Sequence, residues 1–310
     1  MPDSSSFDKQ RVRRNFARAA PAYDAAAAAS REICARLLER LDLIRLAPEQ
    51  ILDAGSGSGV AAGMLVRRYP RAHVTAVDFS LPMLRAQPRS GKWSGTVRAA
   101  LGRGAVHPVC GDFERLPLRS GAIDLVASNL ALHWSDQPAA AFAEMLRVLR
   151  PGGLLAFTTL GPDTLKELAQ ARARAGESSP VHRFVDMHDL GDLLIRSGFA
   201  APVMEMEFIT LTYAQLEDLL RDLRACGALS VRRNRIGLRT PRWRERVAQR
   251  YEAMRRDGRL PATLEVVYGH AWKPGEERSS RASDLTRDGR AIVRFDRPRR
   301  GPSRDPSGGA

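Results

Sequence analysis

The residues of this chain that could do chemistry stand at the ends of three short apolar segments. The first segment ends near an acid and is followed by glycines at alternate positions: Asp53, then Gly55, Gly57 and Gly59. Asp78 and Asp112 follow the next two apolar segments. Glycine lets a ligand lie against bare backbone N–H groups, at the positive end of a following helix. The pattern predicts a nucleotide-like cofactor held by a glycine turn and carboxylates.

Two cofactors are compatible with the glycine turn alone. Gly57–Ala62 fits the G-x-G-x-x-G/A pattern of dinucleotide folds, and Asp78 lies about 20 residues further on, where an acid binds a ribose. S-adenosylmethionine (SAM) explains more residues, because Asp53 can meet its cationic amino acid end and Asp78 can accept its two ribose hydroxyls. Asp112 and Phe113 can contact its adenine. A pyrophosphate would be repelled by Asp53, so the three acids favour SAM.

Alternating strands and helices are needed to bring these acids to one edge of a sheet. Periodicity predicts helices over Phe7–Leu46, interrupted at Ala19–Asp24. After them we expect these strands: Ile51–Ala54, His73–Val77, His107–Cys110, Ile123–Ser128 and Leu154–Thr159. Between them we expect helices at Val60–Arg68, Pro82–Ala86 and Ala139–Leu149, and a loop at 88–105. This alternation indicates parallel βαβ units, which bind ligands at the carboxyl ends of their strands.

The second half of the chain is expected to add two helices and a pair of strands. The helices are predicted at Leu165–Arg174 and Met187–Ser197, and the strands at Met204–Thr212 and Leu264–Trp272. An arginine-rich helical stretch, Gln215–Arg259, separates these strands. We expect five segments: an N-terminal helical cap (1–46), a cofactor-binding core (47–212), a basic helical insert (213–260), a final core strand (261–273) and a disordered basic tail (274–310).

Positive charge is concentrated in the insert. The net charge of the chain is +14, and the stretch from Tyr213 to Leu260 holds 13 arginines and six acidic residues. A local positive surface attracts an acidic macromolecule, either a nucleic acid or an acidic protein. Alternatively, the arginines form a solvent-exposed face that binds no partner.

Other features indicate a cytoplasmic protein without a metal. The cysteines Cys34, Cys110 and Cys226 are far apart, so we expect reduced thiols. No apolar run reaches the about 18–20 residues that span a bilayer, and the polar start predicts no secretory signal. The histidines lack zinc-type spacing. The sequence does not indicate the oligomeric state.

Five motifs together resemble the class I SAM-dependent methyltransferases. They are Leu52–Gly59, Val77–Leu84, Gly111–Leu118, Asp124–Asn129 and Phe142–Gly153. The resemblance implies a Rossmann-like α/β fold, with a mostly parallel seven-stranded sheet, helices on both faces and a helical insert or lid. It implies SAM-binding roles for residues within these motifs: Asp53, Gly55, Gly57, Gly59, Asp78, Phe79, Met83, Asp112, Phe113 and Asn129.

Further segments resemble one family of these enzymes, the malonyl-acyl-carrier-protein O-methyltransferases of biotin synthesis. They are Phe16–Asp24, Asn129–Trp134, Val181–Asp192, Pro202–Met204, Leu211–Tyr213 and Leu260–Trp272. That family methylates the free carboxylate of a malonyl thioester. The resemblance implies that Arg183 binds this carboxylate and that Tyr23 closes the acceptor site. It places His133 and Trp134 at the methyl-transfer point, although the family often has Gln at position 133.

Under this resemblance, the basic insert is expected to bind an acyl carrier protein, because acyl carrier proteins are acidic. The arginines between Arg232 and Arg246 are expected to form the docking face for malonyl acyl carrier protein, although coenzyme A could carry the malonyl group instead. Neither nucleic acid nor membrane is expected as a partner.

Two other functions on the same fold stay open besides methylation of another small molecule. One is a protein arginine hydroxylase like an assembly factor of mitochondrial complex I; the Tyr268–Trp272 motif and the absence of an arginine-rich presequence favour the carboxyl methyltransferase. The other is a nucleic-acid methyltransferase, suggested by an isoelectric point near 10.8. Against it, Asn129–Leu132 lacks the Pro-Pro-Tyr of base-flipping enzymes, and an aromatic content of 6% offers few stacking platforms.

Overall fold

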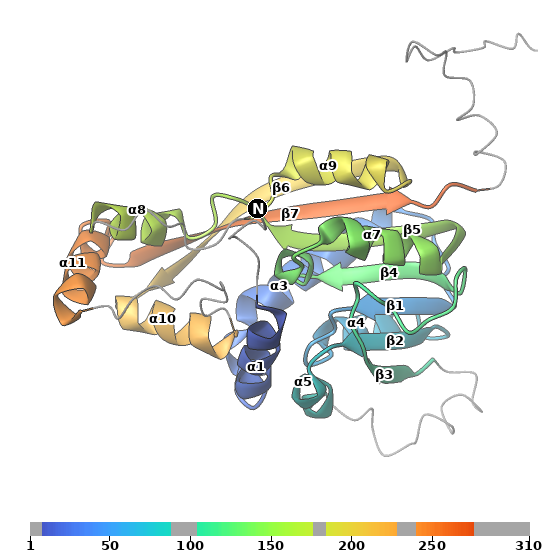
Figure 1. Ribbon diagram of the computed structural model, residues 1–310, viewed down its shortest axis with the longest axis horizontal. Coiled ribbons are helices and arrows are strands. Elements are labelled where there is room, and N and C mark those ends of the chain that lie inside the picture. The colour runs from blue at the N-terminus through green and yellow to red at the C-terminus, as the bar shows by residue number, and fades with distance from the viewer. Residues whose placement is uncertain (1–7, 88–103, 176–183, 228–239, 276–310) are drawn as a thin grey trace, which may run out of the picture. The chain divides into compact units, whose positions relative to one another are not determined.

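A seven-stranded sheet organises the chain (Figure 1). The structure is a computed structural model that describes residues 8–87, 104–175, 184–227 and 240–275. The strands are β1 (Gln50–Ala54), β2 (His73–Asp78), β3 (Val106–Cys110), β4 (Ile123–Asn129), β5 (Leu149–Leu160), β6 (Ala200–Tyr213) and β7 (Leu260–Trp272). Their order is β3-β2-β1-β4-β5-β7-β6; β7 runs antiparallel to β5 and β6, and the other neighbouring strands pair in parallel. The predicted, mostly parallel Rossmann-like sheet is confirmed.

The direction in which successive strands are added reverses between β1 and β4. β1 pairs in parallel with β2 on one side and with β4 on the other. Open α/β sheets bind ligands beyond the carboxyl ends of their strands at such a switch point. Asp53 and Asp78 lie at the ends of β1 and β2, and Asn129 ends β4. The fold therefore brings these three residues to the edge where a cofactor is expected.

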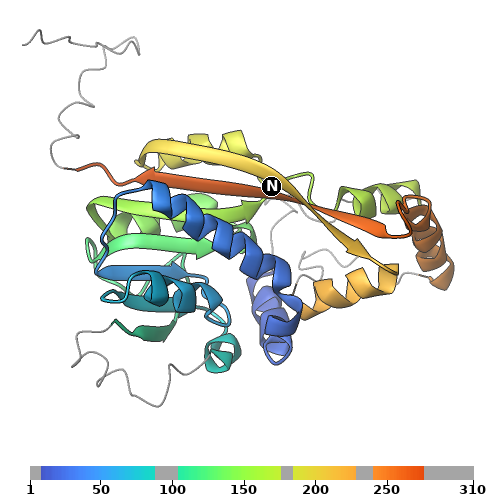
Figure 2. The same cartoon turned by 180° about the vertical axis from the view of Figure 1, so that it is seen from behind.

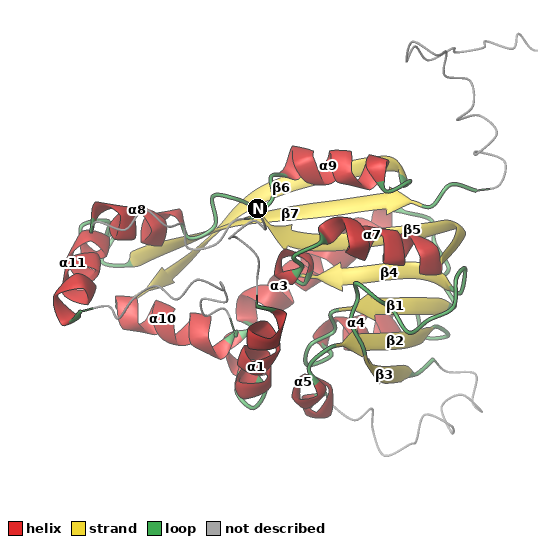
Figure 3. Ribbon diagram, in the orientation of Figure 1, coloured by secondary structure: helices red, strands yellow, loops and turns green. Residues whose placement is uncertain are grey.

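Helices cover both faces of the sheet, as predicted (Figures 2 and 3). α3 (Ala28–Arg40) and α4 (Val60–Arg68) pack on one face, and α7 (Pro138–Val148) and α9 (Met187–Arg196) pack on the other. Successive side chains of a strand point to opposite faces. Accordingly, Ile51 of β1 packs in the α3–α4 core, whereas Leu52 packs in the α7–α9 core, and both are fully buried.

A third buried cluster lies where β6 and β7 run together away from the rest of the sheet. The two strands pair in register from Val203 opposite His270 to Tyr213 opposite Leu260. Three helices gather at this end (Figure 1): α8 (Lys166–Arg174), α10 (Leu216–Ala225) and α11 (Pro241–Glu252). Tyr251 is buried among them, and its hydroxyl donates to the Pro261 carbonyl at 2.7 Å. The described part of the basic insert is therefore packed onto the β6–β7 ribbon.

The N-terminal helices lie beside the carboxyl ends of the strands. α1 (Lys9–Ala19) and α2 (Tyr23–Ala26) confirm the predicted helical start and its interruption. Asp8 caps α1, because its carboxylate accepts the Arg11 N–H. α1 packs against α5 (Leu81–Ala86), the short helix that follows β2. The start of the chain therefore reaches the edge where the predicted cofactor residues lie.

Three predicted boundaries were wrong. β6 begins at Ala200 instead of Met204, because Ala200 and Val203 already pair with β7. β7 begins at Leu260 instead of Leu264, because its antiparallel pairing with β6 continues to Tyr213, beside the insert helices. β5 begins at Leu149 instead of Leu154, directly after α7, so Pro151–Gly153 lies inside the strand, where the Gly152 N–H donates to the Lys273 carbonyl at 3.0 Å. The expected loop at 88–105 and the expected disordered tail lie almost wholly outside the described residues.

The division into five segments stays a prediction. Contacts join Met1–Pro274 into one compact unit, which contains the first four of them.

Candidate active site

The glycine turn after β1 has no room for side chains. Gly55, Gly57 and Gly59 have φ values of +80°, +52° and +83°, a backbone region that favours glycine. A Cβ on Gly55 would lie 2.3 Å from the Cβ of Ala131. Gly59 caps α4 and packs against the side chain of Gln87. The sequence therefore folds here into a bare backbone turn leading into a helix.

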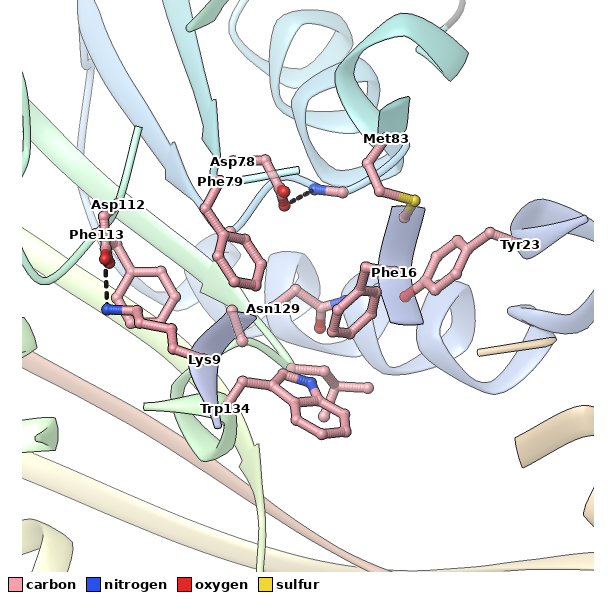
Figure 4. Close-up of a pocket in the computed structure, with 14 residues that line it drawn as sticks. Lys9, Phe16, Tyr23, Asp78, Phe79, Met83, Asp112, Phe113, Asn129 and Trp134 are labelled. Atoms are coloured by element: carbon pink, nitrogen blue, oxygen red, sulfur yellow. Dashed lines mark hydrogen bonds and ion pairs between the residues drawn. The ribbon is translucent and has the colours of Figure 1, made fainter. Parts of the chain in front are cut away.

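A pocket of about 580 Å³, open to solvent, lies beside this turn (Figure 4). Side chains from the ends of β2 and β4, from the loop after β3 and from the N-terminal helices meet around it. The lining residues are Lys9, Phe16, Tyr23, Gly55, Gly57, Asp78, Phe79, Met83, Asp112, Phe113, Asn129, Leu130, Ala131 and Trp134.

Asp78 is held rigidly at the edge of the pocket. Its two carboxylate oxygens accept the backbone N–H of Ser80 at 2.7 Å and of Gly57 at 2.9 Å. Burial raises the pKa of this carboxyl, although these two N–H groups oppose the shift. Each carboxylate oxygen keeps a second lone pair, so Asp78 can accept two hydroxyl groups from a ligand.

Asp112 is already ion-paired in this structure. The Nζ atom of Lys9, on α1, contacts Asp112 Oδ2 and also binds Glu114 Oε2 at 2.6 Å. Burial lowers the pKa of Lys9, but the two carboxylates outweigh this effect and raise it. The ammonium group of Lys9 therefore links α1 to the loop that carries Asp112 and Phe113.

Asp53 lies behind the glycine turn and does not line the pocket. Its side chain is fully buried, and neither carboxylate oxygen has a hydrogen bond of ordinary geometry to any described residue. Burial raises its pKa to about 7, with the Ala62 N–H opposing the shift and the charge of Asp78 adding to it. The buried thiol of Cys34 has a pKa raised to about 12, by burial and by the charge of Asp53. A buried acid with unused oxygens suits a site that receives a positive group.

Asn129 lines the pocket and ties three elements together. Its amide nitrogen donates to the carbonyl of Ser30 at 3.1 Å and to the hydroxyl of Ser30 at 3.2 Å. Its amide oxygen accepts the Thr158 hydroxyl at 2.8 Å. These bonds fix α3 against the ends of β4 and β5.

Aromatic side chains close the pocket from the side of α1 and α2. The ring of Phe16 lies 5.3 Å from Trp134 in an edge-to-face contact, 6.4 Å from Phe79 and 6.3 Å from Tyr23. Such contacts stabilise aromatic pairs beyond the area that they bury. Burial raises the pKa of Tyr23, so its hydroxyl stays protonated at neutral pH and can donate a hydrogen bond.

Of the predicted acceptor residues, His133 does not line the pocket, and the position of Arg183 is not described. The ring of His133 contacts Trp134 and Phe184, with centroids 5.0 Å and 5.8 Å away, but His133 is not among the lining residues. Arg183 lies outside the described residues, as do the arginines at positions 232–239. Arg242, Arg244 and Arg246 of the predicted docking face are exposed on α11.

Four lining residues had no predicted role: Lys9, Phe16, Leu130 and Ala131. Phe16 opens one of the quoted motifs, and Lys9 precedes it by seven residues, which places both on the same face of α1. Leu130 has a φ of +50°, which is unusual for leucine and cannot be read from sequence.

Neither a metal site nor a membrane helix is found in the described parts of the chain. No three His, Cys, Asp or Glu side chains gather there in a way that could hold a metal ion. Within the same ranges, no helix combines the length and apolarity needed to cross a membrane.

Comparison with known proteins places the chain in a family. Residues 52–157 match the family described as "Methyltransferase domain". A curated protein of Laribacter hongkongensis, named malonyl-[acyl-carrier protein] O-methyltransferase, is 50% identical over 95% of this chain and 98% of its own length. A protein of the same name from Gallionella capsiferriformans is 47% identical over 93% and 96%. The chain belongs to this O-methyltransferase family.

Solved structures agree on the fold. A Bacillus halodurans protein that is 20% identical superposes with a TM-score of 0.53 over 78% of this chain and 98% of its own. The chain is thus an enzyme with the class I methyltransferase fold, and its methyl donor is SAM. The pocket suits this donor, since it combines a bare glycine turn, an acid with free lone pairs at the end of β2 and a buried acid behind the turn.

Proposed function

We propose that this protein transfers a methyl group from SAM to the free carboxylate of a malonyl group on an acyl carrier protein. The product is the methyl ester that primes pimeloyl synthesis for biotin. The observation that carries the proposal is the match of nearly the whole chain, at 50% identity, to a curated relative of that activity. The same match favours this function over the arginine hydroxylase and the nucleic-acid enzyme.

On the donor side, each predicted residue has a distinct task. Asp78 would accept the two ribose hydroxyls, and Asp112 with Phe113 would bind the adenine. Gly55 and Gly57 would offer backbone to the amino acid portion, with the charge of Asp53 behind them. The remaining predicted residues would shape the pocket: Gly59 by starting α4, Phe79 and Met83 by apolar contact, and Asn129 by fixing α3. When bound, SAM supplies a sulfonium methyl group for in-line displacement.

On the acceptor side, the protein needs to orient an oxygen and exclude water. A carboxylate is already ionised at neutral pH, so no general base is required. Arg183 would hold the carboxylate through two parallel N–H donors, a geometry suited to guanidinium. Tyr23 would close the site, and its protonated hydroxyl can donate to the acceptor. Trp134 would wall the transfer point, and His133 would support that wall from behind.

We also propose the partner and location. The acidic carrier protein would dock on the basic face from Arg232 to Arg246, and the exposed positions of Arg242, Arg244 and Arg246 on α11 support this. A cytoplasmic location follows from the intracellular occurrence of malonyl carrier protein.

Label transfer from methyl-labelled SAM tests the proposed function. Malonyl acyl carrier protein should acquire base-labile label, whereas acetyl acyl carrier protein should not, because it lacks a free carboxylate. Arg183→Ala should lower the rate of transfer by at least about 100-fold while SAM binding is unchanged, as expected when a charged hydrogen-bond partner is lost. Label on acetyl acyl carrier protein, or full activity of Arg183→Ala, would contradict the acceptor assignment.

A further inference from the structure

Glu114 is the centre of a polar cluster next to the methyl-donor pocket. Its side chain is 15% exposed, and both carboxylate oxygens are used. Oε2 accepts Lys9 Nζ at 2.6 Å, and Oε1 accepts the hydroxyl of Ser135 at 2.6 Å. Glu114 itself does not line the pocket, so it does not belong to the donor-binding residues described above.

The three residues in this cluster come from three different segments of the chain around the pocket. Lys9 comes from α1, and Glu114 comes from the loop after β3 that also carries Asp112 and Phe113. Ser135 directly follows the short 3-10 helix Leu132–Trp134. The hydroxyl of Ser135 also accepts the Gln137 N–H at the start of α7. One half-buried carboxylate thus links the N-terminal helix to both the loop that carries Asp112 and Phe113 and the segment that carries Trp134.

α1 lies over the pocket with one polar and one aromatic attachment. At its first turn, Lys9 contacts Asp112 (Figure 4), and it also contacts Glu114. Two turns later, on the same face, the ring of Phe16 contacts Trp134 and Phe79. Both attachments join α1 to other segments that line the pocket, so α1 cannot lift from the pocket without breaking at least one of them.

The polar attachment of α1 depends on the positive charge of Lys9. Without its ammonium group, Asp112 and Glu114 would be two neighbouring carboxylates that repel each other. With it, each makes a charge-assisted hydrogen bond, which is roughly twice as strong as a neutral one. The side chain of Lys9 is 39% exposed, so dissolved salt is expected to weaken this attachment.

We propose that Glu114 is a positioning residue that, through Lys9, latches α1 over bound SAM and sets the rate at which donor and product leave. The inference rests on the pocket being the SAM site, but it does not depend on the identity of the acceptor. Loss of the Glu114 charge alone weakens the hold on α1 at its first turn and leaves the contact between Lys9 and Asp112.

The test is the dissociation rate of S-adenosylhomocysteine from the full chain, measured by stopped-flow fluorescence with an excess of competing SAM. Glu114→Gln keeps an oxygen for Ser135 but loses the charge that binds Lys9, and Lys9→Met removes the partner. Each should speed dissociation by about 5- to 10-fold. The double variant should be no faster than Lys9→Met alone, because without the ammonium group of Lys9 the charge of Glu114 has no partner on α1. Lys9→Arg should restore a rate near that of the unaltered protein.

Salt dependence and a matched control separate a latch from a general loss of structure. Added salt should speed dissociation from the unaltered protein but not from Lys9→Met. Lys166→Met removes an exposed ion pair between Lys166, the first residue of α8, and Asp163. This variant should leave the rate unchanged. Unchanged rates in folded Glu114→Gln and Lys9→Met, or effects that multiply in the double variant, would overturn the proposal. If a neutral variant does not fold, a salt-independent rate in the unaltered protein overturns it equally. No acceptor is present, so the outcome is independent of the malonyl assignment.

Discussion

At the scale of single residues, Asp53 is the most unusual group in the site. It is fully buried without hydrogen bonds of ordinary geometry in the described chain, and burial raises its pKa from 3.8 to about 7. The folded protein therefore holds a proton that the unfolded chain has already released between about pH 4 and pH 7. Since the unfolded state binds fewer protons in this window, the contribution of Asp53 to stability falls as pH rises through it.

The prediction from Asp53 concerns stability against pH. With the pKa values above, the contribution of Asp53 to the free energy of unfolding is about 2 kcal/mol smaller at pH 7 than at pH 5. Asp53→Asn removes this titration, so its stability relative to the unaltered protein should rise by that amount over the same interval. Urea denaturation of both proteins at the two pH values measures the difference. An equal difference at both pH values would show that Asp53 is ionised in the folded state.

Other residues show what sequence alone cannot supply. Asp78, Asp112, Phe113 and Trp134 line one pocket, because each lies at or shortly after the end of a strand and strand ends meet at one edge of the sheet; what they bind stays a prediction. Lys9 was missed, since its ion pair with Glu114 joins positions 105 residues apart. Such a contact leaves no local pattern in the sequence.

At the scale of elements, the turn joining β1 to α4 sets the shape of the pocket. Gly55 and Gly152 both have positive φ, but only Gly55 is crowded: a Cβ there would meet Ala131 at 2.3 Å, whereas one on Gly152 would meet nothing within 4 Å. The two glycines form a matched pair for alanine substitution.

Alanine at these two positions should separate backbone strain from crowding. Gly152→Ala should cost about 1 kcal/mol, the usual strain of a non-glycine residue at positive φ. Gly55→Ala should cost at least about 2 kcal/mol more and should weaken S-adenosylhomocysteine binding, because the turn must move away from Ala131. Denaturant unfolding and calorimetric binding measure both effects. Equal costs, with binding intact in Gly55→Ala, would contradict the assigned crowding.

The elements themselves were largely predictable because their signals are local. The first four strands, β1 to β4, are short and bounded by glycine, proline or acids, and their positions agree closely with prediction. β7 was predicted too short because Leu260–Thr263 is held in the sheet by pairing with the end of β6 and by packing in the cluster with α8, α10 and α11. That support comes from residues distant in sequence.

At the scale of the whole molecule, the donor site and the basic insert have separate proposed tasks. The donor site would bind SAM, and the insert would bind the carrier protein. The donor pocket lies at the carboxyl ends of the parallel strands, while the exposed arginines of α11 lie on the helices around the β6–β7 ribbon. A carrier protein bound at the insert could deliver its cargo on a long flexible arm. Electrostatic complementarity of this kind mainly raises the rate at which two proteins associate.

Charge reversal tests this division. Changing Arg242, Arg244 and Arg246 to Glu should raise KM for malonyl acyl carrier protein by at least about tenfold, because it reverses the field that attracts an acidic partner. KM for malonyl-coenzyme A should stay the same. The matched control reverses three exposed arginines outside the insert, Arg67, Arg71 and Arg196. A similar rise for both substrates, or the same effect in the control, would contradict a docking face on α11.

The central claim is that the methyl group reaches the free carboxylate of the malonyl group. Intact-protein mass spectrometry of malonyl acyl carrier protein, after incubation with the unaltered enzyme and SAM, tests it most directly. We predict a mass gain of one methyl group that depends on both enzyme and SAM, sits on the malonyl group after fragmentation, and disappears after mild base. No gain, or a gain that survives base or lies on the carrier protein itself, would contradict the account.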